Sequence, residues 1–234
     1  MKESRNINQA NGNALIKAAD ISRHYTMADG TVQALSNVSL TVNMGEFIAI
    51  TGPSGSGKST LMNILGLLDT CDSGTYMFSG LDTKTLADNE LRRIRNERIG
   101  FVFQSFNLIP TLSVVENVAL PLTYRGIPTA KRLERSLSAL EAVGLSARLS
   151  HKPYELSGGQ QQRVAIARAI AADPDLILAD EPCGSLDSRS SKEVMELLRS
   201  RHECGKTVIR IHHDVSAAKY ADRILTVCDG KLYK

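Results

Sequence analysis

The chain has 234 residues, 42% hydrophobic and 23% charged, which fits one globular unit with an ample core. Its 28 basic and 25 acidic residues give a net charge of +3 without a dense Lys/Arg run, so a nucleic-acid partner is not indicated. No apolar run approaches the roughly 18 to 20 residues that span a bilayer, and no signal-peptide pattern opens the chain. The four cysteines lack metal-ligand spacing. We therefore expect a soluble, unprocessed protein of a reducing cytosol, without zinc.

The first elements in chain order are a tail and a sheet. Residues 1–13 are rich in Asn and Gln and poor in large apolar groups, which predicts a flexible tail. From Ala14 the residues alternate between apolar and polar, which predicts an antiparallel sheet with strands at Leu15–Ala18, Val32–Leu35 and Val38–Val42. Tyr25 lies within this region, where its spacing alone indicates ordinary packing.

A phosphate-binding loop follows the short apolar strand expected at Phe47–Thr51, and a helical pattern begins directly after the loop. Its glycines allow a tight turn that points backbone N–H groups at phosphate oxygens, and the helix adds its positive end. Lys58 is expected to reach the β- and γ-phosphates, and Ser59 to offer its hydroxyl to Mg²⁺. A loop that merely turns is the alternative. The loop comprises Gly52, Pro53, Ser54, Gly55, Ser56, Gly57, Lys58 and Ser59, with Thr60 behind it.

A helix is predicted next at Leu86–Arg98, then an apolar strand at Ile99–Gln104. A polar residue at a strand's carboxyl end is where open α/β sheets place their ligands, although Gln104 alone would be an ordinary loop residue. Residues 105–156 carry several prolines and short helical patches, which predicts an inserted helical subdomain. Its opening stretch, Phe106–Leu112, is too apolar for a solvated loop and fits either core packing or a docking surface.

Two polar groups of residues come later in the chain. Ser157 is placed to cap a helix, and Gly158 and Gly159 in its first turn leave backbone N–H groups open to an anion, unless they merely begin the helix. The buried strand predicted at Leu176–Asp180 ends on Asp180 and Glu181. Adjacent carboxylates fit a Mg²⁺ ligand followed by a base that polarises water, with a helix-capping pair as the alternative.

Together these motifs resemble the ATP-binding subunit of an ABC transporter, over roughly residues 14 to 232. The resemblance identifies the Walker A motif with Gly52–Ser59, the signature with Leu156–Gln160 and the Walker B motif with Leu176–Asp180. It identifies the Q-loop with Gln104, the catalytic glutamate with Glu181 and the D-loop with Ser185–Asp187. The switch histidine would be His213, and the adenine-stacking aromatic would be Tyr25.

The resemblance implies an α/β P-loop NTPase with a RecA-like core, an antiparallel β subdomain and an inserted α-helical subdomain. The core and β lobe would take residues 14–104 and 161–234, and the helical subdomain with the signature residues 105–160. It also implies a homodimer with ATP sandwiched between the copies. In that dimer Ser157, Gly158, Gly159, Gln160 and Asp187 of one copy would meet the nucleotide held by the other. Mg²⁺ would be bound by Ser59, Gln104 and Asp180, and catalysis would use Glu181, His213, Gln104 and Lys58.

Within the family, the chain is most similar to the MacB/LolD/FtsE group. That similarity implies a separate membrane permease docking near Phe106–Leu112, and a cytoplasmic location at the inner face of the membrane. Export, lipoprotein or peptide extraction, or MacB-type efflux are the functions implied. The alternative is an ABC ATPase of DNA repair or of translation. Repair members have a long coiled coil within the core and translation members have two cassettes per chain, and this sequence shows neither feature. A P-loop kinase would leave Leu156–Gln160 unexplained.

Four residues depart from the group's usual pattern: Cys183, Ser185, Arg210 and His212. Strand alternation puts Ile209, Ile211 and His213 on one face and Val208, Arg210 and His212 on the other, so only one histidine can face the nucleotide. A buried Arg210 would require a carboxylate or carbonyl partner.

Overall fold

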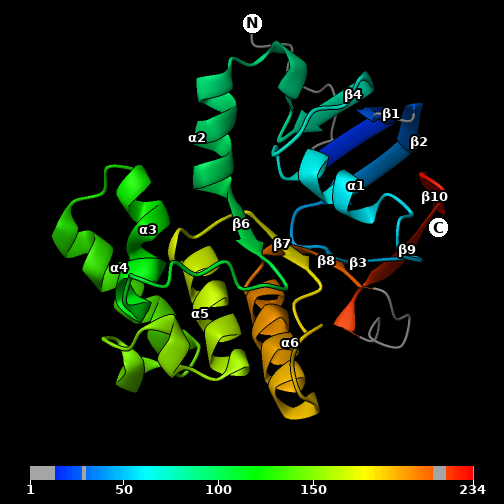
Figure 1. Ribbon diagram of the computed structural model, residues 1–234. Helices are drawn as coiled ribbons and strands as arrows, with labels where there is room; N and C mark the ends of the chain where they lie inside the picture. The colour runs from blue at the N-terminus through cyan, green and yellow to red at the C-terminus, as the bar shows by residue number, and fades with distance from the viewer. Residues whose placement is uncertain (1–13, 28–29, 213–219, 234) are drawn as a thin grey trace, which may run out of the picture.

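The computed structural model describes residues 14–27, 30–212 and 220–233 and forms two β-sheets with helices between and beside them (Figure 1). The tail predicted at 1–13 and the switch histidine predicted at 213 lie outside the described residues. The α/β class predicted from the sequence is confirmed.

The first sheet is antiparallel, with strand order β2-β1-β4-β5. The prediction of separate strands at 32–35 and 38–42 is wrong, because β2 runs unbroken through Ser36 and Asn37. Asn37 has a φ of +50°, and the pairing shifts register opposite this region, so the strand is bulged rather than ended. The strands are β1 Ala14–Met27, β2 Gly30–Asn43, β4 Ser73–Phe78 and β5 Leu81–Asp82.

The second sheet has strand order β10-β9-β3-β8-β7-β6, and all its pairs are parallel except β10 with β9. β3 and β8 are buried along their full length, as expected for parallel strands covered on both faces. The strands are β3 Phe47–Thr51, β6 Ile99–Val102, β7 Leu176–Asp180, β8 Thr207–Ile211, β9 Arg223–Cys228 and β10 Lys231–Tyr233.

Helices cover both faces of this parallel sheet. One apolar core lies between it, α1 and the antiparallel sheet, and the other joins its opposite face to α3, α4, α5 and α6. The α-helices are α1 Lys58–Leu65, α2 Asp88–Arg98, α3 Val114–Tyr124, α4 Thr129–Ala142, α5 Gly158–Ala171 and α6 Ser188–Glu203. Single 3₁₀ turns occupy Thr83–Thr85, Ser146–Arg148 and Pro153–Glu155. None of the helices in the described part of the chain combines the length and apolar content needed to cross a bilayer.

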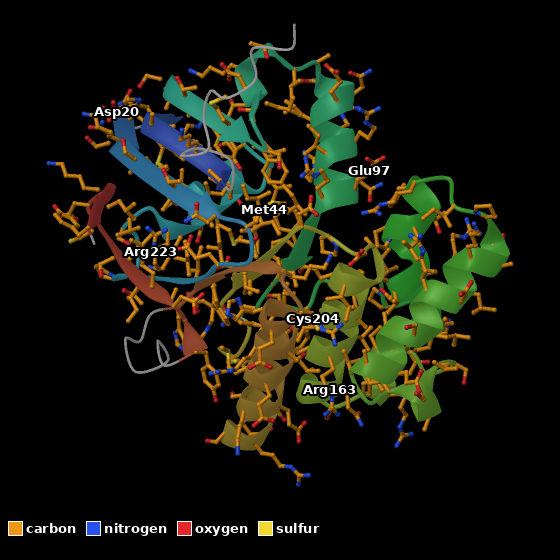
Figure 2. The ribbon with its side chains drawn as sticks, turned by 180° about the vertical axis from the view of Figure 1, so that it is seen from behind. Asp20, Met44, Glu97, Arg163, Cys204 and Arg223 are labelled. Atoms are coloured by element: carbon orange, nitrogen blue, oxygen red, sulfur yellow. The ribbon has the colours of Figure 1, made fainter. Side chains whose placement is uncertain are left out.

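Polar contacts tie the layers together. Arg223, at the start of β9, donates from Nη2 to the Thr41 carbonyl of β2 at 2.7 Å and so links the two sheets. Arg163 of α5 pairs with Glu193 of α6 at 2.5 Å; both arginines are labelled in Figure 2. α5 packs against α3 and α4 as well as against β6. The domain boundary that we propose at residue 160 therefore falls within a helix shared by both parts.

Candidate active site

The phosphate-binding loop is shaped by three glycines with left-handed backbone, Gly52, Gly55 and Gly57, whose φ values are +146°, +76° and +103°. A Cβ at Gly52 would overlap the Val227 carbonyl oxygen of β9, and one at Gly57 would overlap the Ala34 carbonyl oxygen of β2. The loop is thus clamped between two strands from different sheets. Only glycine fits these two positions, for reasons of both φ and space.

Lys58 begins α1 and is 5% exposed, with its Nζ donating to the carbonyl oxygens of Gly52 at 2.9 Å and Pro53 at 2.7 Å. Burial lowers the pKa of this ammonium, while the charges of Glu181 and Asp180 act in the opposite direction. The lysine and the two carboxylates therefore influence one another electrostatically.

The loop also holds a polar atom that a ligand could use. Ser56 Oγ is buried without a hydrogen-bond partner among the residues that the structure describes. Together with the cation of Lys58 and the start of α1, this donor fits the negatively charged oxygens of a polyphosphate. Ser59 is exposed in the first turn of α1, and Thr60 is half-buried behind it.

Glu181 follows β7 in a left-handed conformation, with a φ of +44°. Its N–H donates to the Ile211 carbonyl of β8 at 3.1 Å, and its own carbonyl accepts from the Gly184 N–H at 3.0 Å. These bonds fix a backbone geometry that non-glycine residues seldom adopt, directly after the carboxylate of Asp180. Strain of this kind is concentrated at functional sites, which supports a role for Glu181.

Gln104 is exposed, two residues beyond the end of β6. Its side chain lies against Gly184, where an added Cβ would come within 2.7 Å of Gln104 Nε2. Ser185 Oγ lies 3.5 Å from the Gln104 carbonyl oxygen. The structure thus brings the predicted Q-loop residue to the segment that follows Glu181, at the carboxyl edge of neighbouring strands.

The predicted signature forms the start of α5. Ser157 Oγ accepts from the Gln160 N–H at 3.3 Å, and Gln160 Oε1 accepts from the Ser157 N–H at 3.0 Å, which is a capping box. Gly158 lies against Leu186, and a Cβ at Gly159 would overlap the side chain of Ser190 in α6. Gly159 is therefore also required by the packing of α5 on α6, whereas a Cβ at Gly158 would make only an ordinary contact with Leu186.

Asp187 caps α6 by accepting from the N–H groups of Arg189 at 3.0 Å and Ser190 at 2.9 Å, and the Ser190 bonds lower the pKa of this carboxyl. The starts of α5 and α6 lie together through the Gly159 and Ser190 contact. Figure 1 shows α5 and α6 at the lower centre and α1 at the upper right. Within one chain, the phosphate-binding loop at the start of α1 and the signature at the start of α5 therefore lie apart from each other.

The predicted alternation of side chains along β8 holds from residue 208 to 211. Ile209 and Ile211 lie in the core on the α1 side, and Val208 lies in the core on the α5 and α6 side. Arg210 is 2% exposed. His212 follows the strand, half-buried, and its N–H donates to the Ile50 carbonyl of β3 at 3.0 Å.

Sequence reasoning missed the residues that surround Tyr25. Its hydroxyl donates to Asp69 Oδ2 at 2.7 Å, and the Arg23 guanidinium lies over its ring, 4.9 Å from the centroid. The signal available in the sequence was Arg23 itself, because it stands two residues from Tyr25 and so shares its face of β1.

Comparison with known proteins identifies the family. The chain matches the family model described as ABC transporter over residues 35–184. It is 51% identical over 213 residues to the uncharacterized ABC transporter ATP-binding protein YvrO of Bacillus subtilis, covering 91% of this chain and 93% of that protein. It is 46% identical over 218 residues to the macrolide export ATP-binding/permease protein MacB of Vibrio parahaemolyticus, covering 93% of this chain. This chain spans 33% of the length of that MacB.

Solved structures of ABC cassettes support the same family assignment. The dimeric structure of MJ0796, a bacterial ABC transporter cassette, superposes with a TM-score of 0.86 at 45% identity, covering 94% of this chain and 97% of that chain. A post-hydrolysis state of the same cassette, bound to ADP and Pi, gives a TM-score of 0.86 at 44% identity, covering 94% and 97% of the two chains. The chain therefore belongs to the ABC transporter family and is an ABC ATPase domain.

Proposed function

We propose that the chain binds and hydrolyses ATP as one of two identical subunits and drives a separate membrane subunit, in export, lipoprotein or peptide extraction, or MacB-type efflux. The observation that carries the proposal is the position of Lys58, which is 5% exposed at the start of α1 and bonded through Nζ to the Gly52 and Pro53 carbonyls of the glycine loop. The names of relatives support export: MacB is a macrolide exporter, and SyfD of Pseudomonas syringae, 47% identical, is a probable syringafactin exporter.

The chemistry follows from the groups in the site. Lys58 and the loop N–H groups would hold the β- and γ-phosphates, and Tyr25 would stack on adenine. Ser59, Gln104 and Asp180 would hold Mg²⁺, which when bound neutralises charge on the phosphates. Glu181 would polarise the attacking water. We carry over the water-positioning role of His213 from the family resemblance alone.

A dimer would complete the site. In this proposal Ser157 to Gln160 and Asp187 of one copy cover the nucleotide held on Lys58 of the other. The separate positions of the two surfaces in one chain support it, as do the dimeric MJ0796 structures. The dimer would then be isologous, with a two-fold axis that relates two equivalent sites, each built from the loop of one copy and the signature of the other.

Complementation between two inactive variants tests this arrangement. Lys58→Ala disables the loop and Ser157→Arg disables the signature, so each should lose turnover alone. Mixed dimers would contain one intact loop facing one intact signature. A 1:1 mixture should therefore recover about a quarter of wild-type turnover, since half of the dimers are mixed and each has one good site of two. A mixture as inactive as its components would contradict a shared site, and an active Lys58→Ala variant would contradict the ATPase assignment.

For the membrane subunit, we propose docking at a groove of about 900 Å³ between α2, β6 and α3. Phe103 and Tyr124 supply aromatic surface, and Arg92 and Arg93 supply positive charge, so an amphipathic cytoplasmic segment with acidic residues would fit. Of the stretch Phe106–Leu112, only Asn107 lines this groove.

The stretch itself divides into two parts. Leu108 packs against the core formed with the helices, whereas Ile109 is 37% exposed. Leu108 thus fits the core-packing interpretation and Ile109 the docking one. Charged probes of docking therefore belong at exposed positions beside the groove, because a charge at Leu108 would disturb the fold.

Docking can be tested with the full chain and membrane vesicles of its host. Tyr124→Glu tests the groove, and Ile109→Glu tests the exposed part of the stretch Phe106–Leu112; each should reduce binding to the vesicles without changing ATP binding. Tyr233→Glu is the matched control, because Tyr233 is 53% exposed at the sheet edge and does not line the groove. Equal binding by all three variants would contradict this docking site. A wild-type chain that does not bind the vesicles would argue against the cytoplasmic, peripheral membrane location that we propose.

A further inference from the structure

The segment around Tyr25 contains a network of charged groups that the proposed function does not use. Arg23 Nε and Nη2 donate to the two carboxylate oxygens of Asp69 at 3.1 and 2.8 Å, which is a bidentate pair. Its remaining terminal nitrogen, Nη1, donates to Asp72 Oδ1 at 2.6 Å. The guanidinium is thus fixed by two carboxylates, and its side chain is only 22% exposed.

The same network fixes the ring of Tyr25. Asp69 Oδ2 accepts from the tyrosine hydroxyl at 2.7 Å, while the guanidinium lies over the ring at 4.9 Å. One carboxylate therefore holds both the cation and the phenol, and it is itself anchored by the Thr70 N–H at 2.8 Å. The ring has a defined orientation, with a cation on one face, and remains half-exposed.

The hairpin that carries Tyr25 passes beside the phosphate-binding loop. Tyr25 pairs with Val32 and Arg23 with Leu35 across the β1 and β2 hairpin. Between those partners lies Ala34, whose carbonyl oxygen occupies the space beside Gly57. The network also joins β1 to the residues just beyond α1, the helix that begins at Lys58.

We propose that Arg23 is a positioning residue for the nucleotide base. Held by Asp69 and Asp72, the Arg23 guanidinium fixes the orientation of the Tyr25 ring before the base binds. It also draws electron density from the ring, which favours stacking of a purine on the other face of the ring. This inference rests on the proposed stacking of adenine on Tyr25. Because a side chain already held in place loses less conformational freedom on binding, the network raises affinity for the base and not for the phosphates.

Calorimetric binding of Mg-ATP and of inorganic tripolyphosphate to the full chain tests the proposal. Tyr25→Ala should weaken ATP binding about tenfold, within the range for one stacked base, and leave tripolyphosphate binding unchanged. Arg23→Ala should weaken ATP binding about three- to tenfold, again without affecting tripolyphosphate. Added to Tyr25→Ala, it should have no further effect, since it acts only through the ring.

Two further variants keep the test valid if Arg23→Ala fails to fold. Arg23→Lys retains the charge but loses the bidentate fork, so it should recover only part of the ATP affinity. Asp69→Asn should weaken ATP binding in the same direction. Arg199→Ala is the control, since it removes an exposed arginine and a 2.9 Å surface ion pair with Glu203.

The outcomes separate the two ideas. If Arg23→Ala weakens ATP and tripolyphosphate equally, or adds fully to Tyr25→Ala, Arg23 is structural and the inference is overturned while the stacking proposal stands. If Tyr25→Ala itself leaves ATP affinity unchanged, the stacking role is wrong and the inference fails with it.

Discussion

Arg168 of α5 holds the loop between β6 and α3 in a conformation that the loop would not adopt alone. Its Nη1 donates to the Asn107 carbonyl at 2.5 Å and its Nη2 to the Phe106 carbonyl at 2.8 Å. Burial lowers the pKa of this guanidinium, so the carbonyls compensate for lost water. Phe106 and Asn107 are both left-handed, with φ values of +59° and +49°, which costs about 1 kcal/mol for Phe106 and less for Asn107, since Asn adopts this region more readily.

Arg168→Met removes both hydrogen bonds while keeping an unbranched apolar stem. Bonds from a charged donor are worth about 1.5 to 3 kcal/mol each, and the lower value applies here because the Asn107 bond is exposed. About 3 kcal/mol would therefore be lost. Release of the two left-handed residues returns about 1 to 2 kcal/mol once the loop relaxes. The expected net loss in the free energy of unfolding is about 1 to 2 kcal/mol, accompanied by a rearranged loop.

Guanidinium unfolding measures the stability change, and limited proteolysis with chymotrypsin, which cuts after aromatic residues such as Phe106, reports the loop. We expect cleavage at residues 105–112 to accelerate well before global unfolding. Arg92→Met is the control, because its ion pair is exposed and should contribute less than about 1 kcal/mol. If Arg168→Met matches this control in both stability and cleavage, the loop is held by something else and the reasoning is wrong.

Three further predictions concern the nucleotide site itself. Glu181→Gln should keep ATP binding and an ATP-bound dimer by gel filtration while turnover falls by roughly 10² or more, and wild-type turnover would refute its role as base. Gly57→Ala should abolish ATP binding by calorimetry, because the new Cβ would overlap the Ala34 carbonyl at a φ of +103°; normal affinity would show that the loop can move aside. His213→Ala should abolish hydrolysis at saturating ATP whereas His212→Thr stays within a few-fold; the reverse pattern would assign the switch to His212.

The sequence predicted those features whose cause is local. A strand, a glycine loop and a helix follow one another around Lys58, and each is fixed by its own residues, so the loop and the class of fold could both be predicted. The capping role of Ser157 was also predictable, because it depends on Gln160 only three residues away. Consistency among local signals is what made these predictions specific.

Features that depend on distant contacts could not be predicted from the sequence. The break expected in β2 is absent because pairing with β1 tolerates a bulge at Asn37, and this depends on a second strand. The left-handed Glu181 is imposed by a hydrogen bond to Ile211 from another strand. Likewise, only the fold shows that Leu108 packs into a core while its neighbour Ile109 faces outward.

Two of the residues that depart from the family pattern meet in one layer of the fold. Arg210 shares the face of β8 that packs toward α5 and α6, opposite the α1 side on which Lys58 begins its helix. Burial raises the pKa of the Cys183 thiol and the Arg210 charge lowers it, so the two groups lie within electrostatic reach. Cys183 also contacts the Ser191 carbonyl of α6, with a sulfur-to-oxygen distance of 3.6 Å.

This placement determines which step the departures can influence. The buried Arg210 and the Cys183 thiol lie on the side of the sheet that packs against α5 and α6. These helices begin next to Ser157 and Asp187, the residues proposed to meet the second copy. Leu35 and Val227, which border the glycines of the phosphate-binding loop, belong to the core on the other face of the sheet, together with Ile209 and Ile211. Because electrostatic and packing effects decline with distance, we expect these substitutions to alter the closing of the dimer more than the binding of nucleotide to a single chain.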